Sequence, residues 1–230
     1  MFTVTVIIPC YNMERSVGDA IRSVQAQTFK NWNLIVVDDG STDGSWEQIL
    51  LSIGEDQRCT AIRKENGGVA AARNAAIERS CSEWILPLDA DDKLAPRALY
   101  EYALAVQQNP DADLIVPWVH HISPEKDWLV RRQWKGYDSL LQNNCLPNSC
   151  MFRRAGWQYA GGYRDRTMYE DWEFWIRYLF PEAKVVVVQK PLIEYAVRPG
   201  SRVREAVKRH REEVEIIKQL NPNIYGKSRT

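Results

Sequence analysis

Three carboxylates, Asp89, Asp91 and Asp92, lie within four residues directly after an apolar run at 84–88. Side chains alternate between two faces in an extended chain, so Asp89 and Asp91 are expected on the same side. Such a pair suits Mg2+ or Mn2+, which takes its remaining ligands from waters and phosphates. The alternative is a solvated acidic turn in which Asp92 caps a helix with Pro96 in its first turn. Because short motifs need structural context, the surrounding elements must decide between the two readings.

The first half of the chain alternates strand and helix signals. Strands are predicted at 4–8, 34–37, 60–63 and 84–88, and helices at 14–27, 45–52 and 69–79. Strand, helix and strand in succession form right-handed βαβ units, so these strands are expected to lie side by side and parallel. No strand is followed by Gly-x-Gly-x-x-Gly, which argues against a hydride-transferring dinucleotide enzyme.

Three of these strands end in polar segments, namely 9–12 (Pro-Cys-Tyr-Asn), 38–40 (Asp-Asp-Gly) and 89–91 (Asp-Ala-Asp). In an open doubly wound sheet, ligands bind outside the carboxyl ends of the strands. The three segments are therefore expected to meet in one crevice. This convergence predicts a nucleotide site.

The second half of the chain is less regular. Helices are predicted at 96–107, 170–179 and 202–220, strands at 113–117, 148–152 and 185–188, and mixed strand and loop at 128–134. Glu170 and Asp171 fall in the first turn of their helix, where the helix dipole stabilises anions. That position is equally compatible with a purely structural role for either acid.

The last predicted helix has an apolar seam with 4-3-4-3 spacing, made of Val203, Val207, His210, Val214 and Ile217. A seam this short favours docking on its own domain over a coiled pair, which leaves a homodimer as the alternative. Four cations on the helix leave a peripheral membrane association open: Lys208, Arg209, Arg211 and Lys218. The neighbouring glutamates argue against it.

Composition limits the classes of function. A chain of 230 residues with 30 basic and 30 acidic residues has no net charge, so no basic field indicates nucleic acid. Five cysteines without a paired spacing indicate free thiols in a reducing compartment. A zinc set of Cys145, Cys150, His120 and His121 matches no standard spacing. Without a signal peptide or an apolar run of membrane-spanning length, the chain is expected to be cytoplasmic and at most peripheral to a membrane.

Taken together, the motifs resemble the inverting, metal-dependent family 2 glycosyltransferases, which have the GT-A fold. The resemblance runs from Val4 to about Arg202. It is carried by 6–12 (Val-Ile-Ile-Pro-Cys-Tyr-Asn), 36–43 (Val-Val-Asp-Asp-Gly-Ser-Thr-Asp), 65–74, the Asp-x-Asp at 89–91, and Gly161-Gly162-Tyr163 followed by Glu170-Asp171-Trp172. Five motifs in the family's order are far more specific than any one of them.

The resemblance implies a Rossmann-like, mostly parallel sheet flanked by helices over 1–201, with a nucleotide-binding half at 1–95, an acceptor-side half at 96–201, and a C-terminal helix and tail at 202–230. It implies nucleotide contacts from Pro9, Tyr11, Asn12, Asp39, Asn66, Gly68, Arg73 and Asp89. Asp91 is implied as the ligand of Mn2+ or Mg2+, Asp171 as the catalytic base, and Glu170 and Trp172 as acceptor-side residues. The His that such enzymes sometimes carry near Tyr195–Arg202 is absent, which leaves the diphosphate's partner on that side open.

The implied reaction moves a sugar from a nucleotide sugar, with a UDP-sugar favoured, to a glycan or lipid-linked acceptor in cell-surface polysaccharide or glycolipid synthesis. Two other hypotheses remain. A sugar-nucleotide nucleotidyltransferase would need a similar sheet and acid-bound Mg2+, but the segment at 9–12 lacks its Gly-rich basic loop. A non-catalytic binding subunit of the same shape would be marked by loss of Asp91 or Asp171, and both are present.

Overall fold

The computed structural model describes residues 2–198 and 202–226. The strands are β1 (Val4–Cys10), β2 (Trp32–Asp38), β3 (Cys59–Arg63), β4 (Trp84–Pro87), β5 (Lys93–Leu94), β6 (Leu114–Ile122), β7 (Trp128–Val130), β8 (Met151–Arg153) and β9 (Val185–Ala196). The helices are α1 (Val17–Gln25), α2 (Ser45–Ile53), α3 (Gly68–Arg79), α4 (Ala98–Gln108), α5 (Tyr137–Gln142), α6 (Arg154–Ala160), α7 (Glu170–Tyr178), α8 (Arg202–Lys208), α9 (His210–Leu220) and α10 (Pro222–Tyr225).

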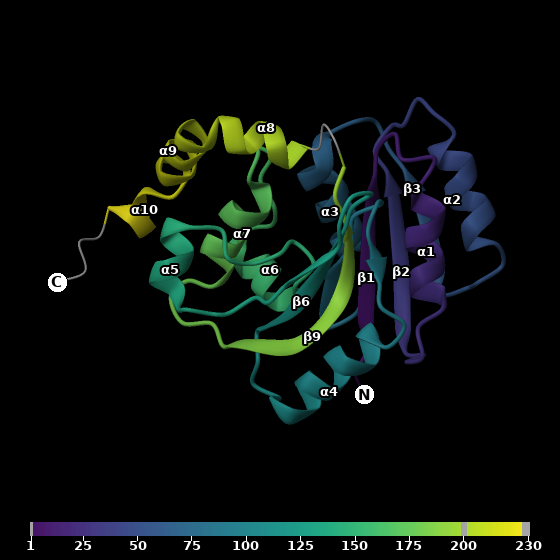
Figure 1. Ribbon diagram of the computed structural model, residues 1–230, viewed down its shortest axis with the longest axis horizontal. Coiled ribbons are helices and arrows are strands. Elements are labelled where there is room, and N and C mark those ends of the chain that lie inside the picture. The colour runs from purple at the N-terminus through teal and green to yellow at the C-terminus, as the bar shows by residue number, and fades with distance from the viewer. Residues whose placement is uncertain (1, 199–201, 227–230) are drawn as a thin grey trace.

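One mixed sheet joins the strands of the described residues in the order β3-β2-β1-β4-β8-β6-β9-β5, with β7 paired to β6. From β3 to β4 the strands are parallel, so their carboxyl ends lie at one edge. Beyond β4 the directions mix: β8 is antiparallel to both neighbours, whereas the long β6 and β9 run parallel to each other (Figure 1). The predicted α/β fold, a mostly parallel sheet between helices, is confirmed.

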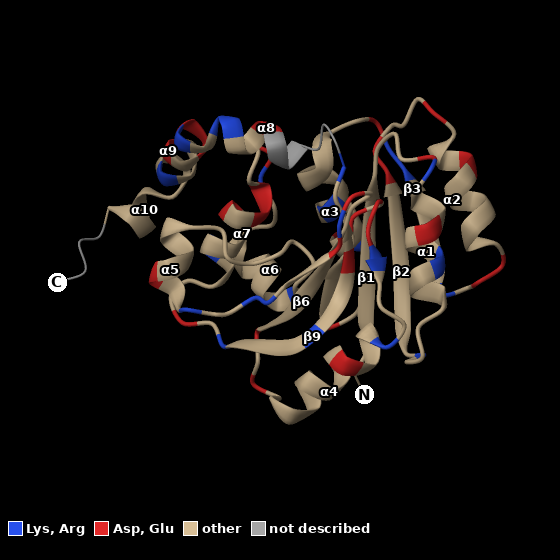
Figure 2. Ribbon diagram, in the orientation of Figure 1, with Lys and Arg blue, Asp and Glu red and all other residues tan. Residues whose placement is uncertain are grey.

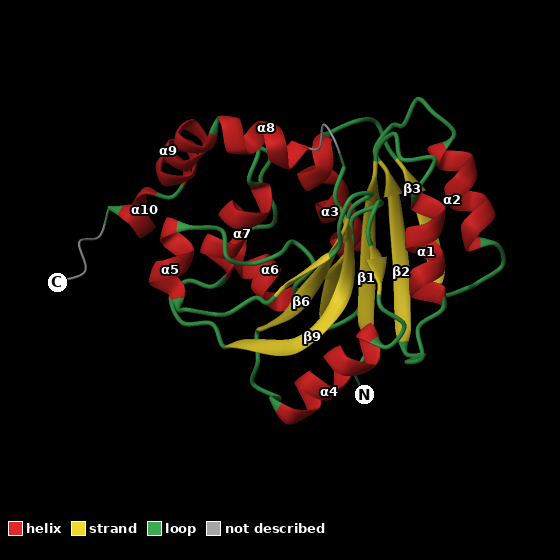
Figure 3. Cartoon of the chain, viewed as in Figure 1, coloured by secondary structure: helices red, strands yellow, loops and turns green. Residues whose placement is uncertain are grey.

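Alternation along β1 separates two apolar layers. Val6 and Ile8 pack into a cluster that includes residues of α1, α2 and α4, whereas Ile7 packs into a second cluster with residues of α3, α6 and α7. Figure 3 shows α1 and α2 on one side of the sheet and α3, α6 and α7 on the other. Each such side chain contributes about 1.5–3 kcal/mol when fully buried. Because both faces are covered, the open end of the sheet is left for function.

Several boundaries differ from the sequence prediction. Pro9 does not end the first strand, since β1 continues to Cys10 and Pro9 lies in register with Val37 of β2. The first helix begins at Val17 and not at residue 14, because residues 13–16 form turns. The last strand is three times longer than its Val-rich stretch, since β9 extends to Ala196.

The predicted helix at 202–220 is interrupted at Arg209, between α8 and α9. This break ends the 4-3-4-3 seam: Val207 is 61% exposed, while Ala206 is buried instead. Val203 lies outside the side chains that the structure describes. The docking interpretation is confirmed for α9, because Ile217 and Val214 pack into the same cluster as α7.

Candidate active site

The loop after β3 holds the carboxylate of Asp39. One oxygen accepts hydrogen bonds from Lys64 Nζ at 2.7 Å and from the Gly67 N–H at 3.0 Å, and the other accepts from the Gly68 N–H at 2.8 Å. Since α3 starts at Gly68, Asp39 caps this helix from a distant part of the chain. The Asn66 side chain donates to the Asp39 carbonyl at 3.0 Å. The structure thus brings together Asp39, Asn66 and Gly68 of the predicted nucleotide site.

Tyr11 and Asn12 form the turn after β1. Asn12 has a φ of 53°, a left-handed conformation that Asn tolerates better than most residues. Its Oδ1 accepts from the Thr42 N–H at 2.9 Å, and its own N–H donates to Ser41 Oγ at 3.0 Å. The loop after β1 is therefore tied to the loop after β2. Pro9 is buried beneath this turn, while the Tyr11 side chain is 47% exposed and so does not belong to the core.

The acid turn, which we define as residues 88–92, does not stay extended. The Asp92 N–H donates to the Asp89 carbonyl at 3.0 Å, so the argument from alternating faces is wrong. Burial raises the pKa of Asp91, and the negative charge of Asp89 raises it further. Arg198 opposes this increase, with its Nε 3.5 Å from Asp91 Oδ2.

Asp92 is not the helix cap of the alternative reading. It is buried, burial raises its pKa well above the ordinary value, and its Oδ1 accepts from the Ala196 N–H at 3.0 Å. It therefore anchors the end of β9 beside the acid turn. The following helix, α4, begins only at Ala98.

Asp89 and Asp91 fit a hard divalent cation, because two carboxylates that repel each other gain from a shared positive charge. Arg198 supplies part of that charge. The described residues contain no group of three His, Cys, Asp or Glu side chains able to hold a metal, so phosphate and water oxygens would have to complete the coordination. Cys145, Cys150, His120 and His121 likewise form no such group in the part of the chain that the structure describes.

Arg73 of α3 joins the two halves of the site. Its Nη2 donates to Asp89 Oδ1 at 3.0 Å and its Nη1 donates to Glu170 Oε1 at 2.8 Å, while only 3% of the residue is exposed. Asn148 Nδ2 donates to the same oxygen of Asp89 at 3.1 Å. Figure 2 shows basic and acidic segments close together at the ends of the central strands. A single buried guanidinium thus fixes the acid turn relative to the start of α7.

Asp171 lies next to this ion pair, in the first turn of α7. Its Oδ1 accepts from the Trp172 N–H at 2.8 Å, and its Oδ2 accepts from Asn144 Nδ2 at 3.3 Å. Burial first, and the charge of Glu170 second, raise the pKa of Asp171 to about 6, against the opposing effects of Arg73 and these two hydrogen bonds. A carboxyl with this pKa is ionised at neutral pH and more basic than an ordinary Asp.

The two predicted acceptor-side neighbours point into the protein. Glu170 is 7% exposed and paired with Arg73. Trp172 is 1% exposed, and its indole N–H donates to the Leu140 carbonyl at 2.7 Å. A ring buried in this way packs α7 against α5, so any acceptor-side role of Trp172 would be to position α7; the assignment itself stays a prediction.

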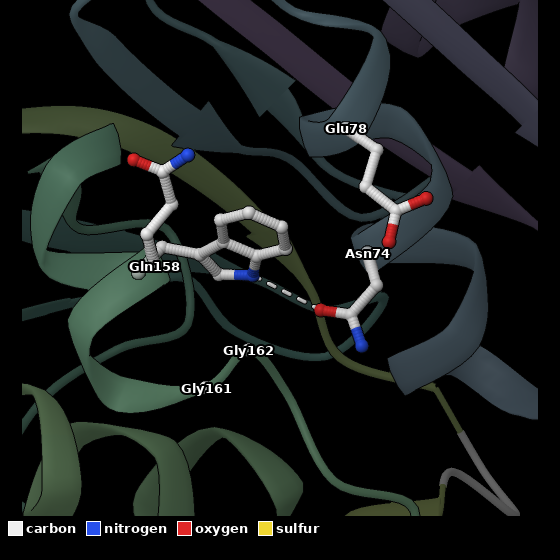
Figure 4. Close-up of a pocket in the computed structure, with 6 residues that line it drawn as sticks. Asn74, Glu78, Gln158, Gly161 and Gly162 are labelled. Carbon is white, nitrogen blue, oxygen red and sulfur yellow. Dashed lines mark hydrogen bonds between the residues drawn. The ribbon is translucent and has the colours of Figure 1, made fainter.

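Asn74, next to Arg73, clamps the Gly-Gly turn to α3. Its Oδ1 accepts from Trp157 Nε1 at 3.0 Å and from the Tyr163 N–H at 2.9 Å, and its Nδ2 donates to the Tyr163 carbonyl at 2.9 Å. Figure 4 shows Asn74 facing the turn of Gly161 and Gly162. Gly162 has a φ of +74°, and a Cβ there would lie 3.0 Å from Asn74 Oδ1. The close approach therefore requires glycine.

Two surface hollows lie beside the site. One of about 440 Å³ is lined by Arg164, Asp165, Arg166 and Leu220. The other, of about 300 Å³, is lined by Asn74, Glu78, Trp157, Gln158, Gly161 and Gly162 (Figure 4). Neither is lined by Asp39, Asp91 or Asp171. The candidate active site is therefore defined by the residues at the carboxyl ends of β1, β2 and β4, and not by either of these hollows.

Sequence reasoning missed four polar side chains of the site: Lys64, Asn144, Asn148 and Arg198. A strand was predicted to start at Asn148, whereas β8 starts at Met151. The local abundance of Asn between residues 143 and 148 is a loop signal that could have corrected this boundary. It could not have indicated which carboxylate each amide meets.

Comparison with known proteins identifies the architecture. The family model described as Glycosyl transferase family 2 matches residues 5–160, more than half of the chain. The chain belongs to glycosyl transferase family 2. The Glycosyltransferase GlyG of Streptococcus pneumoniae is 32% identical to this family 2 glycosyltransferase over 114 residues, which cover 49% of this chain and 38% of GlyG. An uncharacterized glycosyltransferase of Methanocaldococcus jannaschii is 26% identical over 204 residues, covering 84% of this chain and 70% of that protein.

Solved structures agree with the GT-A fold. TarS 1–349 of S. aureus in complex with UDP-GlcNAc superposes with a TM-score of 0.76 at 19% identity, covering 89% of this chain and 61% of that one. The mannosyltransferase PcManGT of Pyrobaculum calidifontis, in complex with GDP-Man and Mn2+, gives a TM-score of 0.69 at 20% identity and covers 92% and 62%. This family 2 glycosyltransferase spans 13–38% of the length of the first curated relatives that it matches. In its described residues, no helix is both long and apolar enough to cross a membrane.

Proposed function

We propose that this family 2 glycosyltransferase transfers a hexosyl or N-acetylhexosaminyl group from a nucleotide-diphosphate sugar to an acceptor hydroxyl, with inversion. The observation that carries the proposal is the double ion pair of Arg73, which links Asp89 of the acid turn to Glu170, the neighbour of Asp171 in the first turn of α7. A UDP-sugar is favoured as donor, because TarS 1–349 binds UDP-GlcNAc in a similar fold.

The donor would lie across the carboxyl ends of β1, β2 and β4. Tyr11 offers an exposed ring on which the base can stack. Asp39 and the start of α3 would hold the nucleoside, with backbone N–H groups of the helix N-terminus available for anionic oxygens. Asp89 keeps the acid turn in place through Arg73 and Asn148.

Asp91, supported by Asp89, would hold Mn2+ or Mg2+. The cation would neutralise charge on the departing nucleoside diphosphate. PcManGT was solved with GDP-Man and Mn2+. Arg198 lies 3.5 Å from Asp91 and is available as a second positive group for the diphosphate. Arg198 would then be the diphosphate's partner on the side where the sequence left one open.

Asp171 would take the proton of the attacking hydroxyl. One displacement from the face opposite the leaving group inverts the anomeric centre, and it needs a carboxylate separate from the metal. Asn144 and the Trp172 N–H orient the carboxylate. Glu170 is occupied by Arg73 and therefore positions its neighbour without accepting the proton.

The acceptor would be a glycan or a lipid-linked saccharide of the cell surface, reached from the cytoplasm or from the inner face of a membrane. Similar proteins are named as candidate glycosyltransferases of teichuronic acid biosynthesis in Bacillus subtilis and of colanic acid biosynthesis in Escherichia coli. These relatives are 40% and 36% identical over 91 and 108 residues.

A thermal-shift panel tests the donor. UDP-, GDP- and dTDP-sugars are added with Mn2+ or with EDTA, because a ligand that binds the folded state raises the melting temperature by mass action. We expect the largest increase with a UDP-sugar and Mn2+. Stabilisation by no nucleotide sugar would contradict the proposal. Release of pyrophosphate from UTP and a sugar 1-phosphate would favour a nucleotidyltransferase instead.

A further inference from the structure

Three aromatic side chains form a ladder across neighbouring strands of the acceptor-side half. Trp128 of β7 lies in register with His121 of β6, which lies in register with Tyr195 of β9. The ring centroids are 4.9 Å apart for Trp128 and His121 and 4.8 Å apart for His121 and Tyr195. The interplanar angles are 34° and 40°, so each ring is tilted relative to the next one. The proposed transfer chemistry uses none of these residues.

The ladder leads from the site to the edge of the sheet. At its inner end, Tyr195 precedes Ala196, whose N–H donates to Asp92 of the acid turn. The carboxylates of the acid turn and of Asp171 lie close enough to raise the pKa of Tyr195, although burial contributes most. At its outer end Trp128 is 40% exposed, on a strand that pairs only with β6 in the described part of the chain.

These rings match the surface of a sugar. A pyranose has an apolar C–H face, which packs on an aromatic ring, and a rim of hydroxyls that need both donors and acceptors. The Tyr195 hydroxyl can donate and accept. Neutral imidazole can do the same, and burial and then Arg132 lower the pKa of His121, which keeps its ring neutral at pH 7.

We propose that Trp128, His121 and Tyr195 form a subsite for a saccharide ring of the acceptor, next to the point of transfer. The inference rests on the proposed glycosyl transfer and deepens it by naming the residues that would bind a sugar of the acceptor. In this subsite the exposed Trp128 ring would stack on one sugar, and Tyr195 is the ring nearest in sequence to Ala196, which bonds the acid turn. The ladder thus selects an acceptor with at least one sugar before the reacting one.

Saturation-transfer NMR tests the subsite directly. The probes are methyl glycosides and disaccharides of glucose, galactose, mannose and N-acetylglucosamine, with UDP and Mn2+ present. We compare the wild type with Trp128→Ala and with Trp128→Leu, which keeps an apolar side chain on β7 if the alanine variant fails to fold. Tyr159→Ala is the matched control, because Tyr159 is 79% exposed on α6, away from the ladder. Loss of ring stacking should raise the Kd of the bound saccharide by roughly 5- to 10-fold in the Trp128 variants and leave the control unchanged.

Calorimetry of UDP with Mn2+ in the same samples separates the two proposals. Unchanged UDP binding with weakened saccharide binding supports the subsite. No saccharide bound by the wild type, or equal binding by both Trp128 variants, overturns the subsite and leaves the donor site intact. Failure of the wild type to bind UDP overturns the proposed function. Binding of the wild type, but not of Trp128→Ala, to phosphatidylglycerol vesicles without any saccharide effect would assign Trp128 to a lipid surface and overturn the inference.

Discussion

Replacement of Asp171 by Asn separates the chemistry of this carboxyl from its structural contacts. The amide keeps the size of the side chain, and its oxygen can still accept from the Trp172 N–H, which lies 2.8 Å from Oδ1 in the native protein. The new amide NH2 replaces Oδ2, so the variant loses the longer hydrogen bond from Asn144, which measures 3.3 Å. The variant therefore removes the basicity of the side chain and leaves the backbone of α7 in place.

Two quantities should change in the Asp171→Asn variant, the turnover number and the free energy of unfolding. Loss of a positioned general base should lower kcat by about 10²- to 10⁴-fold. The native carboxyl has a pKa of about 6 against an ordinary 3.8, so the folded state binds its proton more tightly than the unfolded state and loses stability as pH rises from about 4 to 6. The full difference corresponds to about 3 kcal/mol, and because the Asp171 residue is only partly buried, solvent screening reduces it to about 1–2 kcal/mol. The Asn variant should therefore be more stable than the wild type by about that amount above pH 7.

The assays are initial rates with the identified acceptor and urea unfolding at about pH 4 and pH 8. The wild type should also show an ascending limb of kcat/KM with an apparent pKa near 6. UDP affinity, measured by calorimetry, should stay unchanged in Asp171→Asn. Normal turnover of this variant would refute the reasoning. A loss of activity confined to Glu170→Gln would transfer the base role to the neighbouring acid.

Three further variants test the surrounding site. Arg73→Met should lower the free energy of unfolding by about 3–5 kcal/mol, because it leaves two carboxylates without their buried cation. A variant whose free energy of unfolding in urea equals that of the wild type would contradict this. Asp91→Asn should abolish the dependence of UDP binding on Mn2+ without lowering the melting temperature, and a calorimetric titration that still responds to EDTA would reject its metal role. Tyr11→Ala should weaken UDP binding by about 1–3 kcal/mol, as loss of base stacking does, whereas a lower melting temperature with unchanged affinity would make Tyr11 a packing residue.

The parallel half of the sheet was predictable because its information is local. The β-branched run from Val4, cut by polar residues, predicts β1, and the acids after β2 and β4 fall where the sheet ends. Hydrophobic periodicity likewise predicts α7 with Glu170 at its first turn. Each of these patterns depends only on residues that are close in the sequence, so the amino-acid sequence alone is enough to predict the element.

The remaining features depend on residues far apart in the chain. Asp89 meets Asn148, 59 residues later, and Arg73 meets Glu170, 97 residues later, and neither spacing carries a local signal. The acid turn was predicted as extended because strand alternation was continued past Pro87, where β4 ends. The burial of Trp172 was not predictable either, because a short motif gives no indication of which face of a helix is buried. Its indole N–H donates to the carbonyl of Leu140, which lies on α5, a helix that was not predicted.

The stereochemistry of transfer tests the central claim most directly. The wild type is given an α-linked UDP-sugar labelled with ¹³C at the anomeric carbon, Mn2+ and the accepted glycan, and the product linkage is assigned by NMR. Attack by a hydroxyl that Asp171 deprotonates, in one displacement, predicts a β-linked product, with none formed by Asp91→Asn. An α-linked product would contradict the account, because a single displacement from the face opposite the leaving group cannot retain the anomeric configuration.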